Sequence, residues 1–245
     1  HHAQISTLLQ DICKLTSEDY ERTLKRLTEA GIIRKSNLNV LFGDELPKYL
    51  LQSLLTQRIE TKQQLIAPLL HKSQNAQFSL SAFPQVDGFR IRDYLKAAAE
   101  QGISGINVLL YGESGTGKTE LARTLAKELR HVLYEVRSTA LTETKSTDDF
   151  ETKYPDKERL RYLSMINNLL SNSSRSLLLI DECETIFEHA CYQYSKEHLQ
   201  RLIEDNDIPC IWITNHIDYL EPTFIRRFKL VTEVPRPTSE DIAAI

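Results

Sequence analysis

The stretch Gly112-Glu113-Ser114-Gly115-Thr116-Gly117-Lys118-Thr119 decides the fold of this chain. It fits the pattern G-x-x-x-x-G-K-[ST], in which a glycine-rich loop binds phosphate groups. An apolar strand pattern at 106–111 precedes the loop, and an amphipathic helix pattern at 118–129 follows it. The same letters also fit a plain glycine-rich turn ahead of a helix, but the flanking strand and helix favour a phosphate-binding loop.

Each residue type in the loop has a physical reason. Glycines let the backbone wrap closely around phosphate oxygens, and the exposed N–H groups form an anion-binding concavity. The helix that follows adds the partial positive charge of its N-terminus. We expect Lys118 to reach the β- and γ-phosphates of ATP and the Thr119 hydroxyl to bind Mg²⁺. The predicted nucleotide-binding residues are Gly112, Glu113, Ser114, Gly115, Thr116, Gly117, Lys118, Thr119 and Glu120.

Strand and helix patterns alternate outward from the loop. A helical pattern at 90–101 comes before it. The strand patterns are 106–111, 131–136, 176–181, 209–214 and 229–234, and the helical patterns between them are 118–129, 157–170 and 195–204. Several strands are almost continuously apolar, which is typical of strands that helices cover on both faces. This alternation predicts an α/β fold with a parallel sheet.

Two carboxylates follow the apolar strand pattern Leu177–Ile180. Ligands of open α/β sheets bind at the carboxyl ends of the strands. We therefore expect Asp181 to hold the Mg²⁺ shell and Glu182 to orient and polarise the attacking water. A solvated acidic turn after a buried strand is the alternative, and the phosphate-binding loop upstream argues against it. Glu184 is expected to be a surface residue.

Polar residues also follow the strand pattern at 209–214. Asn215 is placed to position the same water or to contact the γ-phosphate, although asparagine is common in ordinary turns as well. Further along, we expect a short helix after Pro222 to carry Arg226 and Arg227. Arginine suits the stabilisation of charge on a transferring phosphoryl group. Surface salt bridging is the alternative, and position alone does not separate the two.

These four elements, in this order, resemble the AAA+ ATPases. The loop resembles the Walker A motif, Leu177–Glu182 the Walker B motif, Asn215 sensor 1, and Arg226-Arg227-Phe228 the paired-arginine segment of several AAA+ unfoldases and remodelers. The resemblance covers about Phe83 to Val234. It implies a P-loop core with a five-stranded parallel sheet, in which the sensor-1 strand lies between the two Walker strands. It also implies ATP and Mg²⁺ as cofactors.

The resemblance further implies a homo-oligomeric ring, commonly a hexamer, in which a neighbour's arginine completes each site. Arg226 or Arg227 would then act on the nucleotide of the next subunit. AAA+ members also carry a small helical lid after the core, and we expect that lid to be absent from this chain, which stops at Ile245. Threading members have an aromatic-x-Gly pore loop, whereas the corresponding region here reads Lys153-Tyr154-Pro155-Asp156, which argues against threading. Val86–Ile91 is the best match to the adenine-side motif.

The chain is divided on these grounds into a helical N-terminal region at 1–71, a polar linker at 72–85 and an ATPase core at 86–245. In the first region, Thr16-Ser17-Glu18 predicts a helix start, 46–70 a second helical run, and 5–33 half of a winged helix. Winged helices bind DNA through their second helix, but acidic residues offset the basic ones there. A protein-interaction or structural module is therefore favoured.

Composition narrows the function classes. A net charge of −4 gives no overall case for nucleic acid or an acidic membrane as partner. No apolar stretch reaches the length of a membrane span. The four cysteines are scattered without a C-x-x-C pair, which indicates reduced thiols in a cytoplasmic protein, with Cys183 and Cys210 buried.

The leading hypothesis is a Mg²⁺-dependent ATPase that hydrolyses ATP and remodels a macromolecular partner, more often protein than nucleic acid. Two alternatives stay open. One is a nucleotide-dependent switch or scaffold with slow hydrolysis, and the other is a DNA-linked AAA+ ATPase. The Asp-Glu pair and the arginine pair argue against a small-molecule kinase.

Overall fold

The computed structural model describes residues 16–29, 61, 64, 66–137, 155–170, 175–187 and 196–238. The chain divides into two compact units, His1–Leu65 and Ile66–Ile245. In the first unit, helix α2 spans Ser17–Glu29, as the helix start predicted at 16–18 requires. The Thr16 hydroxyl accepts the backbone N–H of Asp19 at 3.1 Å, a side-chain cap of the helix start. The rest of the predicted winged-helix pattern lies outside the described residues.

The second unit is built on a six-stranded sheet in the order β1-β3-β4-β5-β2-β6. Its strands are β1 (Leu70–Lys72), β2 (Asn107–Tyr111), β3 (Val132–Val136), β4 (Ser176–Ile180), β5 (Cys210–Thr214) and β6 (Leu230–Glu233). Strands β2 to β6 are the five predicted from the sequence, each within one residue of its expected start or end, and they run parallel. The predicted five-stranded parallel core is therefore confirmed, with an antiparallel edge strand, β1, added beside β3.

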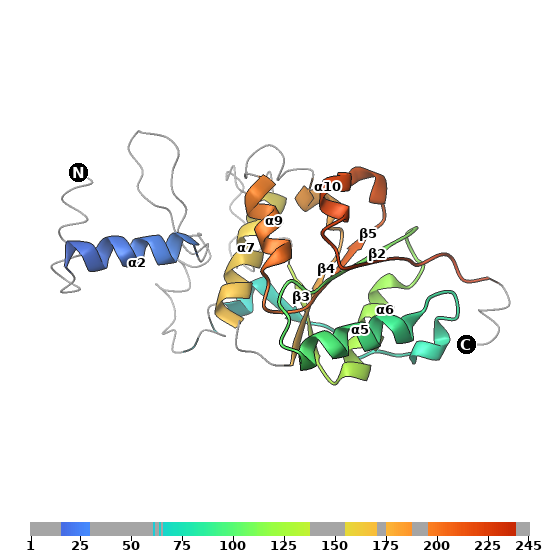
Figure 1. Cartoon of the computed structure of the whole chain (residues 1–245). Helices are drawn as coiled ribbons and strands as arrows, with labels where there is room; N and C mark the ends of the chain where they lie inside the picture. Colours follow the sequence, from blue (N-terminus) through green and yellow to red (C-terminus); the bar gives the residue numbers. More distant parts are fainter. Residues whose placement is uncertain are drawn as a thin grey trace, which may run out of the picture. The chain divides into compact units, whose positions relative to one another are not determined.

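Helices cover both faces of this sheet (Figure 1). Helices α5 (Gly88–Glu100) and α6 (Lys118–Leu129) pack together on one face. Helices α7 (Pro155–Leu170) and α9 (Lys196–Glu204) pack together on the other, where the short α10 (Pro222–Ile225) also lies. This two-sided cover explains why the middle strands are buried along their whole length, as their apolar runs predicted.

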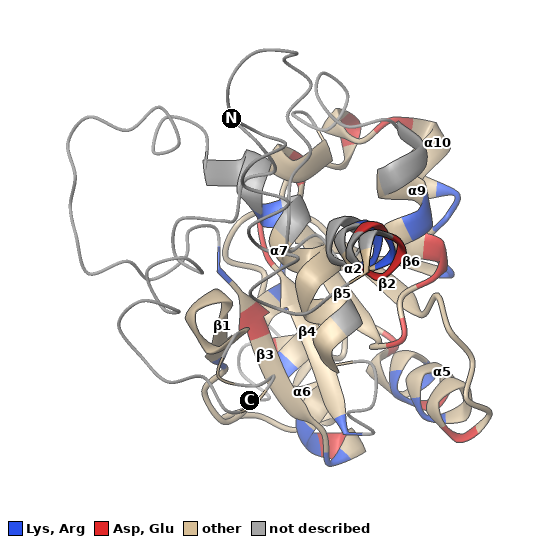
Figure 2. Cartoon of the chain, turned by 90° about the vertical axis from the view of Figure 1, so that its left-hand side faces the viewer, with Lys and Arg blue, Asp and Glu red and all other residues tan. Residues whose placement is uncertain are grey.

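The middle strands of the sheet carry no charged side chains (Figure 2). Strands β2, β4 and β5 carry no Lys, Arg, Asp or Glu, while the helices around them carry many. One face of the sheet joins α5 and α6 in a single apolar core. On the other face, Trp212 of β5 packs against Phe187 and Phe228 with ring centroids 5.7 and 5.8 Å apart, and Phe187 reaches Phe224 of α10 at 5.2 Å. This aromatic cluster thus packs the Arg226-Arg227-Phe228 segment against that face of the sheet.

The segment predicted as a linker, 72–85, differs from that prediction. Leu70, expected to end a helix, instead opens β1, which pairs with β3. Further on, Leu80 and Phe83 are buried in the core, around the short 3-10 helix η2 (Leu80–Ala82). The apolar Leu80 and Phe83 were enough to attach this otherwise exposed stretch to the core, a signal that the Ser, Asn and Gln content concealed. Among the described residues, no helix is both long and apolar enough to cross a membrane.

Candidate nucleotide-binding site

The glycine-rich loop lies where the sequence predicts, between the end of β2 and the start of α6. Gly112, Gly115 and Gly117 all have positive φ, at 145°, 82° and 88°. A Cβ on Gly112 would stand 2.4 Å from the carbonyl oxygen of Val234, so the close approach of β6 requires glycine there. At Gly115 a Cβ would meet no atom within 4 Å. The left-handed turn at Gly115 therefore borders open space, as a loop that receives a phosphate needs.

Lys118 is buried at the first turn of α6, with 5% of its surface exposed. Its amino group donates hydrogen bonds to the carbonyl oxygens of Gly112 at 2.8 Å and Glu113 at 2.6 Å. Burial lowers the pKa of Lys118, and the charges of Asp181 and Glu184 oppose that shift. The amino group is thus held inside the bend of the loop, with two carboxylates close enough to favour its charged form.

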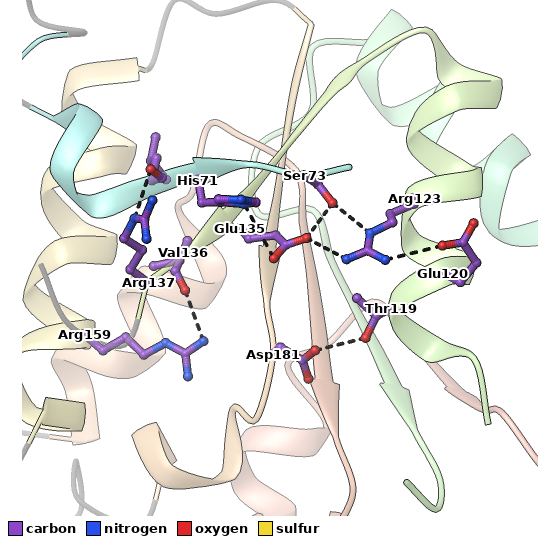
Figure 3. A network of polar contacts seen from close by, with 11 residues as sticks. His71, Ser73, Thr119, Glu120, Arg123, Glu135, Val136, Arg137, Arg159 and Asp181 are labelled. Atoms are coloured by element: carbon purple, nitrogen blue, oxygen red, sulfur yellow. Dashed lines mark hydrogen bonds and ion pairs between the residues drawn. The ribbon is translucent and has the colours of Figure 1, made fainter. Parts of the chain in front are cut away.

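Thr119 and Asp181 lie side by side across the gap between α6 and β4 (Figure 3). The Thr119 hydroxyl donates to Oδ2 of Asp181 at 3.0 Å. Mg²⁺ is held in such sites by one or two carboxylates together with phosphate oxygens and water. A hydroxyl and a carboxylate at this separation fit that donor set. Among the described residues, no group of three His, Cys, Asp or Glu side chains forms a metal site of its own, so the phosphates would supply the remaining oxygens.

Glu182 stands at the edge of the site in an unusual backbone conformation. Its side chain is exposed, and its φ of 50° puts it in the left-handed region. For a residue other than glycine this costs about 1–2 kcal/mol. Its N–H donates to Oδ1 of Asp181 at 2.9 Å, and the next N–H, of Cys183, donates to the carbonyl of Ile213 in β5 at 2.9 Å. The chain turns sharply here, immediately after the metal-binding candidate.

Asn215 directly follows β5, and β5 pairs with β4 on one side and β2 on the other. The strand that leads to Asn215 therefore lies between the strands that lead to the glycine-rich loop and to Asp181, which is the order that the resemblance implied. Because all three strands are parallel, their carboxyl ends meet at one edge of the sheet. Asn215 is half-buried at that edge, together with Asp181 and the loop after Tyr111.

The two arginines differ from each other. Helix α10 ends at Ile225, so both follow the helix rather than lie within it, because Arg226 already forms the C-cap. Arg227 is half-buried and pairs with the carboxylate of Glu204 on α9. Arg226 is exposed. The structure thus places the loop, Asp181, Glu182 and Asn215 at one edge of the sheet. The side chain of Arg226 is exposed to solvent.

Glu120, the residue after Thr119, is engaged by the protein itself (Figure 3). Its carboxylate accepts the N–H of Gln77 at 2.5 Å and Nη1 of Arg123 at 3.4 Å. Arg123 also donates to Oε1 of Glu135 on β3 at 3.2 Å, which accepts the Ser73 hydroxyl as well. The Glu120 side chain therefore ties α6 to the segment after β1, and only its backbone N–H, in the first turn of α6, is available to a nucleotide.

Two charged residues near the site were missed or misjudged from the sequence. Glu184, expected on the surface, is only 9% exposed, and its Oε2 is buried without a hydrogen-bond partner in the described part of the chain. The sharp turn at Glu182 and the contact of Cys183 with β5 bury the residue that follows. Arg159 on α7 is 4% exposed and contacts the carbonyl of Glu182. A charged residue within the apolar face of helix 157–170 was the signal available for it.

Val86 and Ile91, the adenine-side candidates, pack into the core.

Comparisons with known proteins agree with this geometry. The family model described as "ATPase family associated with various cellular activities (AAA)" matches residues 108–236, just over half of the chain. A proteasome-activating nucleotidase of Archaeoglobus fulgidus is 31% identical over 148 residues, which cover 54% of this chain and 35% of that protein. A putative 26S proteasome regulatory subunit homolog of Methanothermobacter thermautotrophicus is 29% identical over 146 residues, covering 55% and 37%. The chain thus matches little more than a third of the length of these relatives.

Among solved structures, one described as "Structural Basis for Katanin Self-Assembly" superposes with a TM-score of 0.52. The superposition covers 76% of this chain and 63% of that chain at 19% identity. At that identity the likeness bears on the fold alone.

Proposed function

Because the chain belongs to the AAA family of ATPases, we propose that it binds ATP with Mg²⁺, hydrolyses the bond between the β- and γ-phosphates, and uses the cycle to remodel a macromolecular partner. The observation that carries this proposal is the contact between the Thr119 hydroxyl and Asp181, at 3.0 Å beside the phosphate-binding loop. Had these two side chains lain far apart, no single Mg²⁺ could bridge them.

Each residue of the site has a distinct part in the proposed reaction. The N–H groups of the loop and the start of α6 bind the phosphates. Lys118 exchanges the carbonyl oxygens of Gly112 and Glu113 for phosphate oxygens when ATP binds. Thr119 and Asp181 would hold Mg²⁺, and the bound ion would supply positive charge next to the β- and γ-phosphates.

The attacking water is oriented on the other side of the γ-phosphate. Glu182 accepts a hydrogen bond from that water and polarises it, and Asn215, at the neighbouring strand end, fixes its position. Charge that develops on the transferring group is stabilised by an arginine from a neighbouring subunit. No protein nucleophile is needed, because positioning and charge stabilisation suffice for this class of reaction.

The direct test compares phosphate release and ATP binding in the unchanged chain and in Glu182→Gln. We expect Glu182→Gln to lower turnover by at least about 10²-fold, since a positioned acid–base group contributes 10²–10⁴, and to keep nucleotide binding. Glu128→Gln, at an exposed position near the far end of α6, serves as the control and should behave like the unchanged chain. Absence of Mg²⁺-dependent phosphate release at every protein concentration would reject hydrolysis and favour the nucleotide-dependent switch.

We also propose that the active form is a homo-oligomeric ring, with six as the expected number of subunits. The exposure of Arg226 supports an active site shared between subunits. ATPase activity measured against protein concentration tests this. Specific activity that rises steeply with concentration is expected, and a flat specific activity would contradict an arginine supplied by a neighbour.

We propose a protein as the partner. The names of two relatives support this choice, the proteasome-activating nucleotidase and the proteasome regulatory subunit homolog. On helix α2, the acidic residues Glu18, Asp19 and Glu21 offset the basic Arg22, Lys25 and Arg26, whereas a DNA-reading helix has a basic face. DNA that raised the ATPase rate in low salt would instead favour the DNA-linked alternative, because phosphate contacts weaken as salt increases.

A cytoplasmic location belongs to the same proposal. Cys183 and Cys210 are buried as free thiols, which fits a reducing compartment.

A further inference from the structure

Arg159 is a buried cation next to the predicted catalytic edge of the sheet. It lies on α7, and only 4% of its surface is exposed. Its Nη2 donates to the carbonyl of Val136, the last residue of β3, at 3.3 Å, and its Nη1 donates to the carbonyl of Glu182 at 3.5 Å. Figure 3 shows the Arg159 side chain reaching from α7 to Val136, with Asp181 on the adjacent strand end. One guanidinium therefore joins the ends of two neighbouring strands.

The backbone pairing of β3 with β4 does not extend to these two carbonyls among the described residues. Strands β3 and β4 are paired up to Glu135 and Leu179. The carbonyls of Val136 and Glu182 lie past this point. Arginine holds its donors in a rigid planar fork and can contact two carbonyls at once, which a lysine ammonium does less well. The buried Arg159 thus continues the link between β3 and β4 after their ladder ends.

The backbone of Glu182 needs such a link. Its left-handed φ of 50° is unfavourable for a glutamate, so surrounding contacts must maintain it. Besides Arg159, the Thr185 hydroxyl donates to the same carbonyl at 3.1 Å. On the other side of the residue, Cys183 N–H is bonded to Ile213 in β5. The direction of the Glu182 side chain follows from this held turn.

We propose that Arg159 is a positioning residue for ATP hydrolysis: by holding the carbonyl of Glu182 against the end of β3, it fixes the backbone turn that aims the Glu182 carboxylate at the attacking water. The inference rests on the proposed function, and it adds a residue that contacts neither nucleotide nor metal. The inference also couples helix α7 to the active site. A shift of this helix would move the Arg159 guanidinium and, through it, Glu182.

The kinetic test uses Arg159→Met, which keeps most of the side chain length and removes both donors. We expect kcat to fall by about tenfold or more while the ATP dissociation constant changes by less than about threefold, the pattern of an interaction that acts in the transition state. Arg159→Lys should recover part of the loss, because it restores one donor. Arg137→Met is the matched control, since Arg137 donates to the carbonyl of Leu70 at 3.3 Å and has no contact with Glu182 among the described residues.

A double-mutant cycle tells positioning from general damage. If Arg159 acts through Glu182, adding Arg159→Met to Glu182→Gln should lower the residual single-turnover rate no further. A full additional loss in the Glu182→Gln background would overturn the inference. So would a kcat for Arg159→Met within about twofold of the unchanged chain.

Hydrogen exchange provides a readout that needs no turnover. Amides of the peptide that contains residues 181–187 should exchange faster in Arg159→Met than in the unchanged chain, and Arg137→Met should leave them as they were. Unaltered exchange in a folded Arg159→Met chain rejects the hold on Glu182, whatever the rate of hydrolysis. A chain without any turnover would reject the proposed function instead, and exchange alone would then decide on Arg159. Should Arg159→Met fail to fold, Arg159→Lys carries the same comparisons.

Discussion

Arg227 forms an ion pair with Glu204 on helix α9, whereas Arg226, its neighbour in the chain, is exposed to solvent. The two adjacent arginines therefore differ in what binds them. Arg227 is held within its own subunit, and its Nε is buried. In the proposed site shared between subunits, Arg226 would be the arginine that reaches the neighbouring nucleotide, and this difference leads to the first prediction.

Arg226→Ala is expected to lower kcat by about 10³-fold, the lower range for a transition-state arginine, with little change in thermal stability. Arg227→Ala is expected to lower the melting temperature instead. Mixing Arg226→Ala chains with Glu182→Gln chains should restore part of the activity, because some interfaces then combine an intact Arg226 with an intact Glu182. Mixtures that remain as inactive as their components would contradict a shared site, and equal loss of kcat in both arginine variants would contradict the assignment to Arg226.

A second prediction concerns the Mg²⁺ dependence of nucleotide binding. Thr119→Ala removes the hydroxyl and Asp181→Asn removes the negative charge of the two groups whose oxygens lie 3.0 Å apart. ATP affinity should be similar to that of the unchanged chain in EDTA, but the gain on adding Mg²⁺ should be lost. Titration of a fluorescent ATP analogue with and without Mg²⁺ measures this.

Asp207→Asn is the control for that experiment, because Asp207 is exposed and precedes β5 at the opposite, amino end of the sheet. It should respond to Mg²⁺ like the unchanged chain. A full Mg²⁺ response in Asp181→Asn would show that the ion is held by other groups.

A third prediction separates backbone strain from ligand binding at a glycine. Gly115 and Gly102 both have positive φ, 82° and 61°, and a Cβ on either would meet no protein atom within 4 Å. Alanine at each position should therefore cost about the same stability, roughly 1 kcal/mol. Only Gly115→Ala should weaken ATP binding, because its methyl group occupies space that the phosphates need. Equal ATP affinity in the two variants, measured alongside urea unfolding, would remove Gly115 from the phosphate site.

The fourth prediction concerns thiol chemistry. Burial raises the pKa of Cys210 well above its ordinary value, so this thiol stays protonated in the folded chain at pH values where an exposed cysteine ionises, above about 8.5. Iodoacetamide at pH 8.5 should leave Cys210 unmodified in the native protein and alkylate it in urea, as mass spectrometry of the peptides would detect. Rapid alkylation of the native protein at Cys210 would mean that β5 opens readily.

Local patterns determined much of this protein in advance. The loop at 112–119 was identifiable because phosphate binding demands glycines, a lysine and a hydroxyl residue at set positions along one short stretch. The parallel strands β2, β4 and β5 were recognisable because strands covered on both faces are apolar almost throughout, and β3 and β6 were recognisable from the alternation of strand and helix patterns. The residues at their carboxyl ends, Asp181 and Asn215, followed from the rule that parallel strands present their ends at one edge.

Only the tertiary structure decided the features that depend on residues far apart in the chain. Leu70–Lys72 formed an edge strand because β3 offered a free edge, and Leu80 and Phe83 of the polar segment at 72–85 were buried because α5 and α6 offered an apolar surface. Glu184 was buried by the turn at Glu182. Arg227 forms an ion pair with Glu204, which lies twenty-three positions before it in the chain. Arg159 of α7 contacts the carbonyl of Glu182, which follows β4. Such contacts arise from three-dimensional proximity, which periodicity and motif spacing do not encode. The chemistry of single segments could therefore be predicted from the sequence, but the contacts between distant segments could not.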